Sequence, residues 1–163
     1  MTIRLTKKLA DKLKIKLAKD YIYELNPIVE WYGHLFIANR IQYILFTNTY
    51  SLYSSIILAK GILTVNKFIE INLLSLYELL KKDGLEIVIE KYITPKLGKV
   101  NFYKTNNRGV LGSMNDMIFQ SKYYLTEYNL STVEISKRLN ETIFGYIKYE
   151  RPISILKQLI SNK

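Results

Sequence analysis

The chain has 163 residues, of which 48% are apolar and 13% aromatic, so it suits one folded domain and is too short for two of ordinary size. It has no cysteine and one histidine, His34, which excludes disulfides, cysteine nucleophiles, thiolate zinc sites and multi-histidine metal sites. A formal net charge of +10 favours an anionic partner.

The sequence carries no signal for a membrane span or for secretion. No apolar run approaches the roughly 18 residues that cross a bilayer. Lysines alternate with leucines at the N-terminus, without the uninterrupted apolar region of a secretory signal. We therefore expect a cytoplasmic protein with a single domain over residues 1–163, and we expect neither a cofactor nor a metal.

The excess positive charge is confined to two segments. Residues 1–20 carry seven basic and two acidic side chains, a net of +5, and residues 91–115 carry five basic side chains and no acid, again +5. Elsewhere bases and acids balance at twelve each. If the two segments meet in the fold, they form a basic face suited to phosphates. The alternative is a lysine-rich surface that only keeps the protein soluble.

The first elements are a short strand and a basic helix. Residues 2–5 alternate polar and apolar side chains, which predicts the strand, and Thr6 is a suitable N-cap for a helix to about Lys19. Leucines recur every four residues in this helix and form one apolar stripe with lysines around it. This pattern is typical of an ordinary surface helix, and equally of a helix that lies on a polyanion or an acidic membrane.

Three antiparallel strands are predicted next. After Asn26-Pro27 breaks regular structure, residues 31–38 and 41–47 have β-like patterns on either side of Asn39-Arg40. A two-residue connection that begins with Asn suits a type I′ hairpin. Residues 51–59 are rich in Tyr, Ile and Leu and predict the third strand.

The middle of the chain predicts a helix and two further strands. Asn66 is a suitable cap for the helix, and Asp83-Gly84 provide its C-terminal stop. Residues 85–93 alternate and are β-branched, which indicates a strand, and residues 99–105 indicate another.

Residues 106–116 form a glycine-punctuated polar turn before a helix. Ser113 is placed as N-cap, with Asp116 three residues later, and the helix is expected to end near Leu125. This pattern fits a well-capped helix start. It also fits a turn whose free amides, with Lys104 and Arg108, bind a phosphate or carboxylate.

The C-terminal part is predicted to be helical. Ser131 and Glu134 have the spacing of a capping box for a helix that ends near Asn140, and Pro152 suits the first position of a last helix. The predicted fold class is α+β: an antiparallel sheet of about five strands with helices packed mainly from the C-terminal half.

Polar residues near predicted turns and helix ends form a second set of candidates. Arginine and asparagine suit phosphates and base edges, although each is also a common turn or cap residue. The set consists of Asn39, Arg40, Ser113, Asn115, Asp116, Arg138 and Asn140.

Catalysis and base stacking have weaker support. His34 lies in a predicted strand, where a lone histidine is usually structural. Glu86 and Glu90 share one face of a predicted strand and could bind a divalent metal ion, but an exposed strand face explains them more simply. The early strands also hold aromatic residues that pack in a core or, if exposed, stack on unpaired bases. These aromatics are Trp31, Tyr32, Phe36, Tyr43, Phe46, Tyr50 and Tyr53.

Several motifs resemble those of an uncharacterised bacterial family that is known only as a domain of unknown function. They are R-L-T-K-K-L at 4–9, W-Y-G-H-L-F-I-A-N-R at 31–40, L-F-T-N at 45–48, N-R-G-V-L-G-S-M-N-D at 107–116 and R-L-N-E-T at 138–142. The resemblance spans most of the chain and implies a soluble bacterial protein, without an assigned chemistry.

The leading hypothesis is a non-enzymatic module that binds nucleic acid or another polyanion. Its contacts would be Lys7, Lys8, Lys12, Lys99, Lys104 and Arg108. A second hypothesis is a small enzyme that acts on a phosphorylated or nucleotide substrate in a cleft formed by Asn39, Arg108, Ser113, Asn115, Asp116 and Arg138. A third is a partner of an acidic protein, as in a toxin-antitoxin pair.

Overall fold

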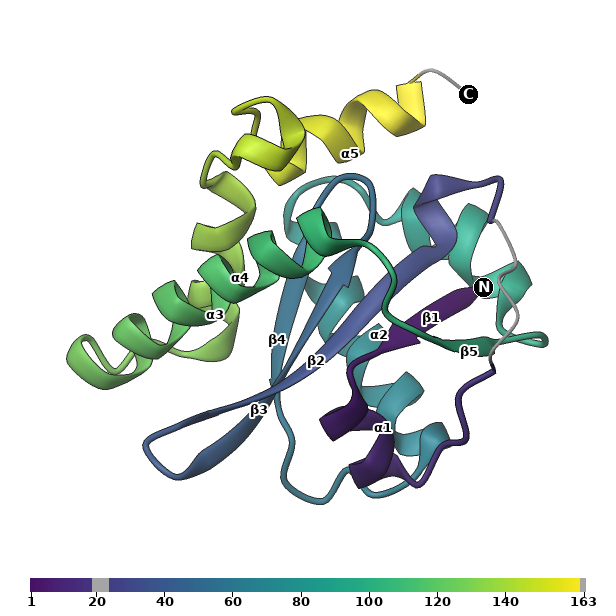
Figure 1. The fold of residues 1–163 in the computed structure, drawn as a ribbon. Helices are drawn as coiled ribbons and strands as arrows, with labels where there is room; N and C mark the ends of the chain where they lie inside the picture. Colours follow the sequence, from purple (N-terminus) through teal and green to yellow (C-terminus); the bar gives the residue numbers. More distant parts are fainter. Residues whose placement is uncertain (19–23, 162–163) are drawn as a thin grey trace.

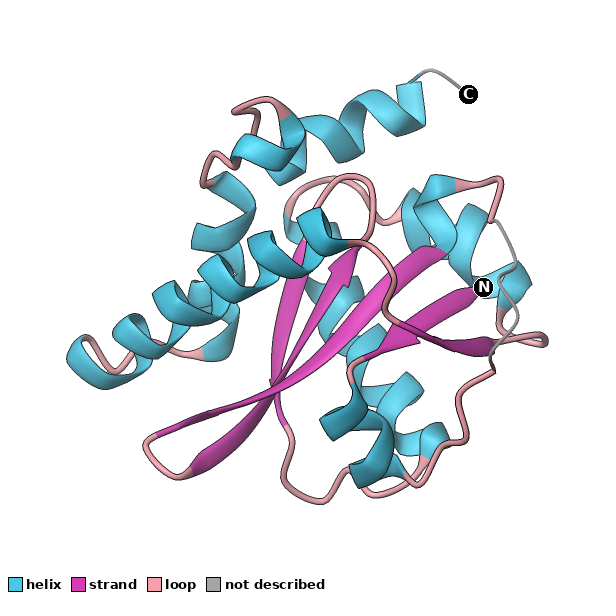
Figure 2. Ribbon diagram, in the orientation of Figure 1, coloured by secondary structure: helices cyan, strands magenta, loops and turns pink. Residues whose placement is uncertain are grey.

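The computed structural model describes residues 1–18 and 24–161. A five-stranded sheet has helices on both of its faces (Figures 1 and 2). The strands are β1 (Thr2–Leu5), β2 (Glu30–Ala38), β3 (Ile41–Asn48), β4 (Ser54–Leu58) and β5 (Asn101–Lys104). The α-helices are α1 (Lys7–Leu13), α2 (Val65–Lys82), α3 (Arg108–Glu127), α4 (Thr132–Glu141) and α5 (Pro152–Ser161). Short helical turns are η1 (Pro27–Val29), η2 (Val88–Ile93), η3 (Thr94–Lys96) and η4 (Gly145–Ile147).

The sheet is mixed. Its strand order is β4-β3-β2-β1-β5; β2, β3 and β4 are antiparallel neighbours, whereas β1 runs parallel to both β2 and β5. The α+β class and the five strands are confirmed, but the prediction of a purely antiparallel sheet is wrong. A parallel pair needs a long crossover connection, and the chain between β1 and β2, which contains α1, provides one.

Helices come from both halves of the chain, which corrects the expectation that they come mainly from the C-terminal half. In Figure 1, α2 lies behind the sheet and α3 crosses its front. The core behind the sheet includes Trp31, Phe46 and Phe68, with Trp31 stacked on Phe46 at 5.0 Å between ring centroids. On the other face, Met114 and Met117 of α3 belong to a second core.

The β2–β3 hairpin forms as predicted. Ala38 pairs with Ile41, and Asn39 and Arg40 between them have φ values of 46° and 63°. Two positive φ angles are what a type I′ turn requires. The third strand is shorter than expected, because β4 begins only at Ser54.

Two helix boundaries differ from the predictions. α1 ends at Leu13 rather than near Lys19, because Lys14 adopts a left-handed conformation with φ 54°; Lys19 itself lies outside the described residues. α2 begins at Val65, and its cap is Thr64 rather than Asn66: the Thr64 side chain accepts a hydrogen bond from the Lys67 amide.

Residues 85–93 form a turn followed by the helical turn η2, so the predicted strand there is wrong. α2 stops at Asp83-Gly84 as expected, and the chain then enters η2. Leu85, Val88 and Ile93 are buried and pack in the core behind the sheet. Glu86 and Glu90 therefore do not share a strand face.

α4 covers the outer edge of β4 with side-chain hydrogen bonds. The Asn140 amide accepts from Ser54 N–H at 2.7 Å and donates to the Ser54 carbonyl at 2.9 Å, and Ser136 Oγ accepts from Ile56 N–H at 2.9 Å. The helix begins with the predicted capping box of Ser131 and Glu134. The backbone groups of an edge strand that would otherwise attract another strand are thus satisfied.

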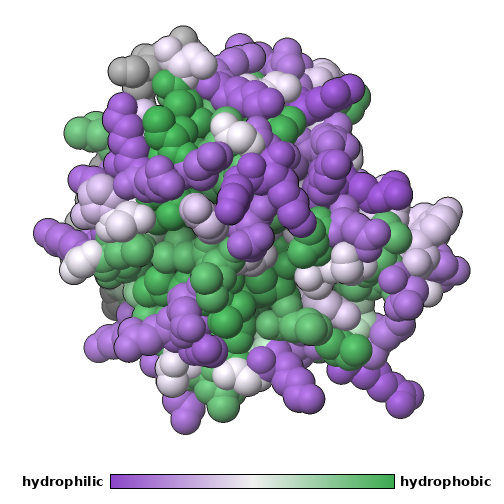
Figure 3. Space-filling model, turned by 180° about the vertical axis from the view of Figure 1, so that it is seen from behind, coloured by the Kyte–Doolittle hydropathy of each residue, from purple (hydrophilic) through white to green (hydrophobic). Residues whose placement is uncertain are grey.

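The molecule also exposes apolar side chains behind the sheet. Seen from behind, they gather over the middle of the molecule, on the side of the sheet that α2 covers (Figure 3). A shallow hollow between β4, α2 and α4 includes Leu58 and Leu74, each about half exposed. This surface suits apolar contacts rather than phosphates.

Candidate nucleic-acid interface

The two basic segments lie side by side. β1 pairs with β5 from Thr2↔Asn101 to Leu5↔Lys104. After α1 the chain returns along the outer edge of β5, where Ala18 forms a parallel bridge with Tyr103. The two segments that hold the excess charge therefore meet along β1 and β5, and again at Ala18.

Four of the predicted contact residues follow the ends of these paired strands. Lys7 and Lys8 come after β1, and Lys104 and Arg108 lie at and after the end of β5. Lys7 and Lys104 border a common hollow of about 390 Å³ that also includes Asp11. All four basic side chains are exposed. Lys8 adjoins Lys7 in the chain, and Arg108 follows Lys104 by four residues; these four residues are called the basic corner below.

Lys7 is partly neutralised by its neighbour. Its ammonium lies 2.8 Å from the Asp11 carboxylate, one turn further along α1. The hydrogen bond to Asp11 raises the pKa of Lys7. No acidic side chain of the described ranges lies within 4.0 Å of Lys8, Lys104 or Arg108, so these three supply most of the corner's charge.

Lys12 and Lys99 do not belong to the basic corner. Lys12 Nζ donates to Gln42 Oε1 at 2.9 Å, which directs it toward β3. Lys99 precedes β5 at its opposite end, where its carbonyl accepts a hydrogen bond from the Met1 ammonium at 3.0 Å. The six predicted contacts are therefore divided among three places.

The start of α3 differs from the sequence prediction. The helix begins at Arg108, and Asn107 is its cap: Asn107 Oδ1 accepts from the amides of Gly109 at 2.9 Å and Val110 at 3.2 Å. Ser113 lies inside the helix and donates to the Gly109 carbonyl. The amides that were expected to hold an anion thus already have partners.

Gly109 has a steric role at this helix start. A Cβ atom there would lie 2.5 Å from the Tyr146 ring, closer than real contacts allow. The Tyr146 hydroxyl accepts a hydrogen bond from Asn107 Nδ2 at 2.9 Å. The glycine therefore lets η4 approach the first turn of α3.

The polar candidate residues are scattered. Asn39 and Arg40 form the hairpin tip, and Asn115 and Asp116 are exposed on α3. The Arg138 guanidinium lies 5.3 Å from the centroid of the Tyr124 ring, and Asn140 is bound to β4.

The cleft of the enzyme hypothesis is not assembled. The Tyr32 hydroxyl contacts Asn106 and Asn107 at the start of α3. Asn39 lies seven residues further along β2, or about 23 Å away along the strand. Asn39 and Arg108 are therefore at opposite ends of β2.

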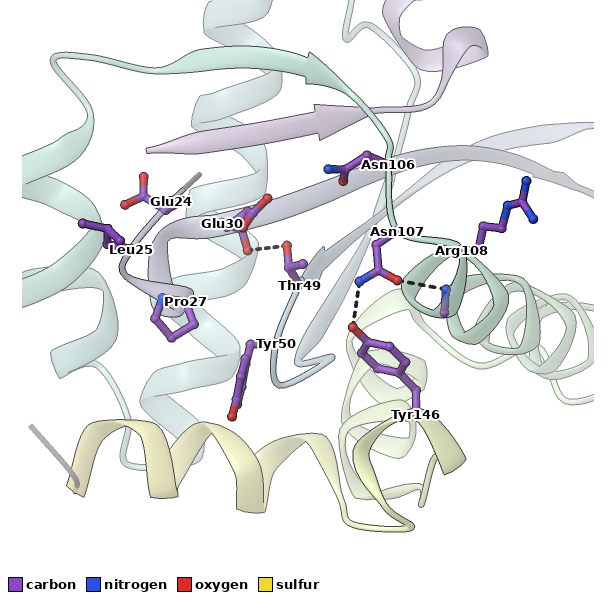
Figure 4. Close-up of a pocket in the computed structure, with 11 residues that line it drawn as sticks. Glu24, Leu25, Pro27, Glu30, Thr49, Tyr50, Asn106, Asn107, Arg108 and Tyr146 are labelled. Atoms are coloured by element: carbon purple, nitrogen blue, oxygen red, sulfur yellow. Dashed lines mark hydrogen bonds between the residues drawn. The ribbon is translucent and has the colours of Figure 1, made fainter. Parts of the chain in front are cut away.

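A hollow of about 570 Å³ beside the start of α3 was not anticipated (Figure 4). Glu30 and Asn106 border it, with Tyr50 from the β3–β4 turn and Tyr146 from η4. Arg108 also borders it and so connects it to the basic corner. One of its residues, Tyr50, was among the seven aromatics considered for base stacking. The other six are buried, whereas Tyr50 is 56% exposed.

Arg4 contributes to the fold rather than to the basic corner. Its side chain is 2% exposed, and its Nε forms an ion pair with Glu30. Nη1 donates to the Lys104 carbonyl at 3.3 Å, and the guanidinium lies 5.5 Å from the Tyr103 ring centroid. Arg4 therefore joins β1 to both of its neighbours.

A matched family model covers residues 2–155, and the family is described as a domain of unknown function (DUF6933). The chain belongs to this family. The motif at 107–116 forms the cap and first turns of α3, and the one at 138–142 contains the Asn140 amide that binds β4. No curated protein matched the chain.

The described residues offer neither a metal-binding group nor a membrane span. No three His, Asp or Glu side chains within 1–18 and 24–161 are grouped closely enough to hold a metal ion. No helix in the same ranges is long and apolar enough to cross a bilayer.

The pKa of His34 is sensitive to nearby lysines as well as to burial. Burial lowers it from its ordinary value, and the nearby charges of Lys8 and Lys122 lower it further. Because unfolding restores the ordinary pKa of about 6.5, the unfolded state binds more protons in mildly acidic solution, and stability falls as the pH drops below that value.

We expect Lys122→Gln to move the His34 pKa back toward its ordinary value. The chain has one histidine, so its ring resonance can be followed by NMR during a pH titration without ambiguity. Lys137→Gln, on α4, is the control and should leave the titration unchanged. A wild-type pKa at or above the ordinary value would contradict this account of His34.

Proposed function

We propose that the protein binds nucleic acid through the basic corner. The observation that carries the proposal is the parallel pairing of β1 with β5, which brings the two segments with the excess charge together. Lys8, Lys104 and Arg108 are exposed there on three different parts of the chain. Phosphates at a regular spacing are the anions that such a group of cations suits.

The expected binding is strongly salt-dependent. Each phosphate contact releases counterions, and about three contacts give a log–log slope near −3 for affinity against salt. Lys7 adds less, because Asp11 remains beside it. The contacts fix the protein on the phosphate backbone and do not by themselves read sequence.

The test compares two double charge reversals. Lys8→Glu with Lys104→Glu changes the basic corner, whereas Lys81→Glu with Lys137→Glu makes the same change in net charge at the end of α2 and on α4. Both of these helices pack against β4, at the opposite edge of the sheet from β5. Affinity for labelled DNA and RNA oligonucleotides is measured by fluorescence anisotropy over a range of salt concentrations.

The corner variant should bind more weakly, and its salt slope should be shallower by about 2, one unit for each phosphate that a lysine no longer neutralises. The control should keep the wild-type slope. Equal decreases in both variants would mean that affinity follows net charge alone, and no binding at low salt would mean that nucleic acid is not the partner. Either result would overturn the proposal. In the second case, an acidic protein that co-purifies with the wild type but not with the Lys8→Glu and Lys104→Glu variant would be the partner instead.

A further inference from the structure

We infer that the hollow beside the start of α3 accepts one unpaired nucleobase between Tyr50 and Tyr146, stacked on the face of one ring and against the edge of the other. The inference rests on the proposed function, because Arg108 borders this hollow and is one of the four residues of the basic corner. It adds a preference for single strands, which the basic corner alone does not give.

The two tyrosines stand at the junction of two hollows. Both border the hollow beside α3, and both also border a neighbouring one of about 500 Å³ against α5. Tyr50 is 56% exposed and Tyr146 is 43% exposed. Figure 4 shows the two rings at different inclinations, the Tyr50 ring seen edge-on and the Tyr146 ring seen nearly face-on. Exposed aromatic faces of this kind stack on bases of any sequence.

Both tyrosines are held in the fold by hydrogen bonds. The Tyr50 amide donates to Asn48 Oδ1 at 3.2 Å, and Asn48 is fully buried. Tyr146 is held by the hydrogen bond between its hydroxyl and Asn107 Nδ2 at 2.9 Å, with its ring against Gly109. Little ordering is therefore required when a base binds.

The charges around the hollow favour a base inside it and the phosphate outside. Glu24 and Glu30 border the hollow; Glu30 is already paired with Arg4, so the carboxylate that a phosphate there would chiefly meet is that of Glu24. Arg108 borders it too, but its guanidinium points away from the tyrosines (Figure 4). A carboxylate accepts hydrogen bonds from the amino groups of base edges. A neutral base in the hollow, with its backbone along Arg108, avoids the repulsion that a phosphate there would meet.

The main experiment measures binding of a single-stranded DNA 12-mer with one 2-aminopurine, and of the duplex with the same sequence. Tyr50→Ala and Tyr146→Ala should each weaken single-strand binding by about 5- to 150-fold, the usual range for one stacked base. Their duplex affinity and salt slope should match those of the wild type. The wild-type protein should quench the 2-aminopurine fluorescence, and both variants should lose the quenching.

Two control variants separate stacking from other effects. Tyr146→Phe keeps the ring and should retain the quenching. Tyr149→Ala removes a tyrosine that is 75% exposed and borders neither hollow, so it should bind like the wild type. Equal affinity of the wild-type protein for both probes, or unchanged quenching in Tyr50→Ala and Tyr146→Ala, would overturn the inference.

A titration with adenosine, which has no phosphate, makes the two proposals separable. Adenosine should shift the ring resonances of Tyr50 and Tyr146 in the wild-type protein and in the Lys8→Glu with Lys104→Glu variant alike. If it does so while oligonucleotides fail to bind, the base site stands and the proposed function fails. If adenosine gives no shift while the basic corner binds oligonucleotides, the proposed function stands and the base site fails.

Discussion

Replacing Arg4 by methionine is expected to lower the free energy of unfolding by about 3–5 kcal/mol, the usual cost of removing one partner from a buried ion pair. Arg4 is 2% exposed and its partner Glu30 has a side-chain exposure of 16%. The substitution keeps most of the side-chain volume and removes the charge, so the Glu30 carboxylate loses its counterion. Urea denaturation followed by circular dichroism measures the change.

A second variant tests whether the unpaired charge of Glu30 causes this destabilisation. Arg4→Met with Glu30→Leu removes both charges, and it should recover much of the stability if the single variant suffers from an uncompensated carboxylate. Lys14→Met, at an exposed position that also lies near the N-terminus, should change stability by no more than about 0.5 kcal/mol. A decrease below about 1 kcal/mol in Arg4→Met would show that the pair behaves as a surface ion pair.

Replacing Asn140 by alanine is expected to cost about 2–4 kcal/mol, because two buried backbone groups of Ser54 lose their partners at once. Asn140 is 1% exposed, so water does not readily replace the amide. Lys137→Ala on the same helix is the control and should be nearly neutral, since Lys137 is exposed.

The Asn140 variant should also associate more readily. Removal of the amide uncovers the outer edge of β4 at Ser54, and unpaired strand edges attract other strands. Size-exclusion chromatography at increasing protein concentration measures the effect, and amide exchange at Ser54 should accelerate. A variant with wild-type stability and a monomeric profile would contradict the role given to Asn140.

Local features of the fold were predictable from the sequence. The hairpin turn at Asn39-Arg40 and the capping box of Ser131 and Glu134 depend on a few adjacent residues, and both formed as expected. The parallel pairing of β1 with β5 was not predictable, because about 100 residues separate the strands and neither strand's pattern specifies its neighbour.

Two segments misled the sequence interpretation for identifiable reasons. Residues 85–93 alternate, but their apolar residues at 85, 88, 89 and 92 also fit a helix, and burial in the core decided in favour of helical turns. At the start of α3, two glycines suggested a loop. Glycine weakens a helix by about 1 kcal/mol, yet Asn107 was available as a favoured cap and Gly109 is required beneath Tyr146.

The candidate site was only partly visible in the sequence. The charge distribution pointed to both halves of the basic corner, since it can be counted along the chain. The hollow beside α3 could not be found in this way. Glu30, Tyr50 and Tyr146 come from a strand and two separate turns, and only the folded chain brings them around one opening.

The central position of β1 affects the order in which the sheet is completed during synthesis. β2, β3 and β4 are consecutive and joined by short turns, so they can associate as soon as they leave the ribosome. β1 is made first, yet one of its two edges stays unpaired until residues 101–104 have emerged. Until then the apolar side chains of Ile3 and Leu5 are only partly buried, and the nascent chain can aggregate through them until β5 has been made.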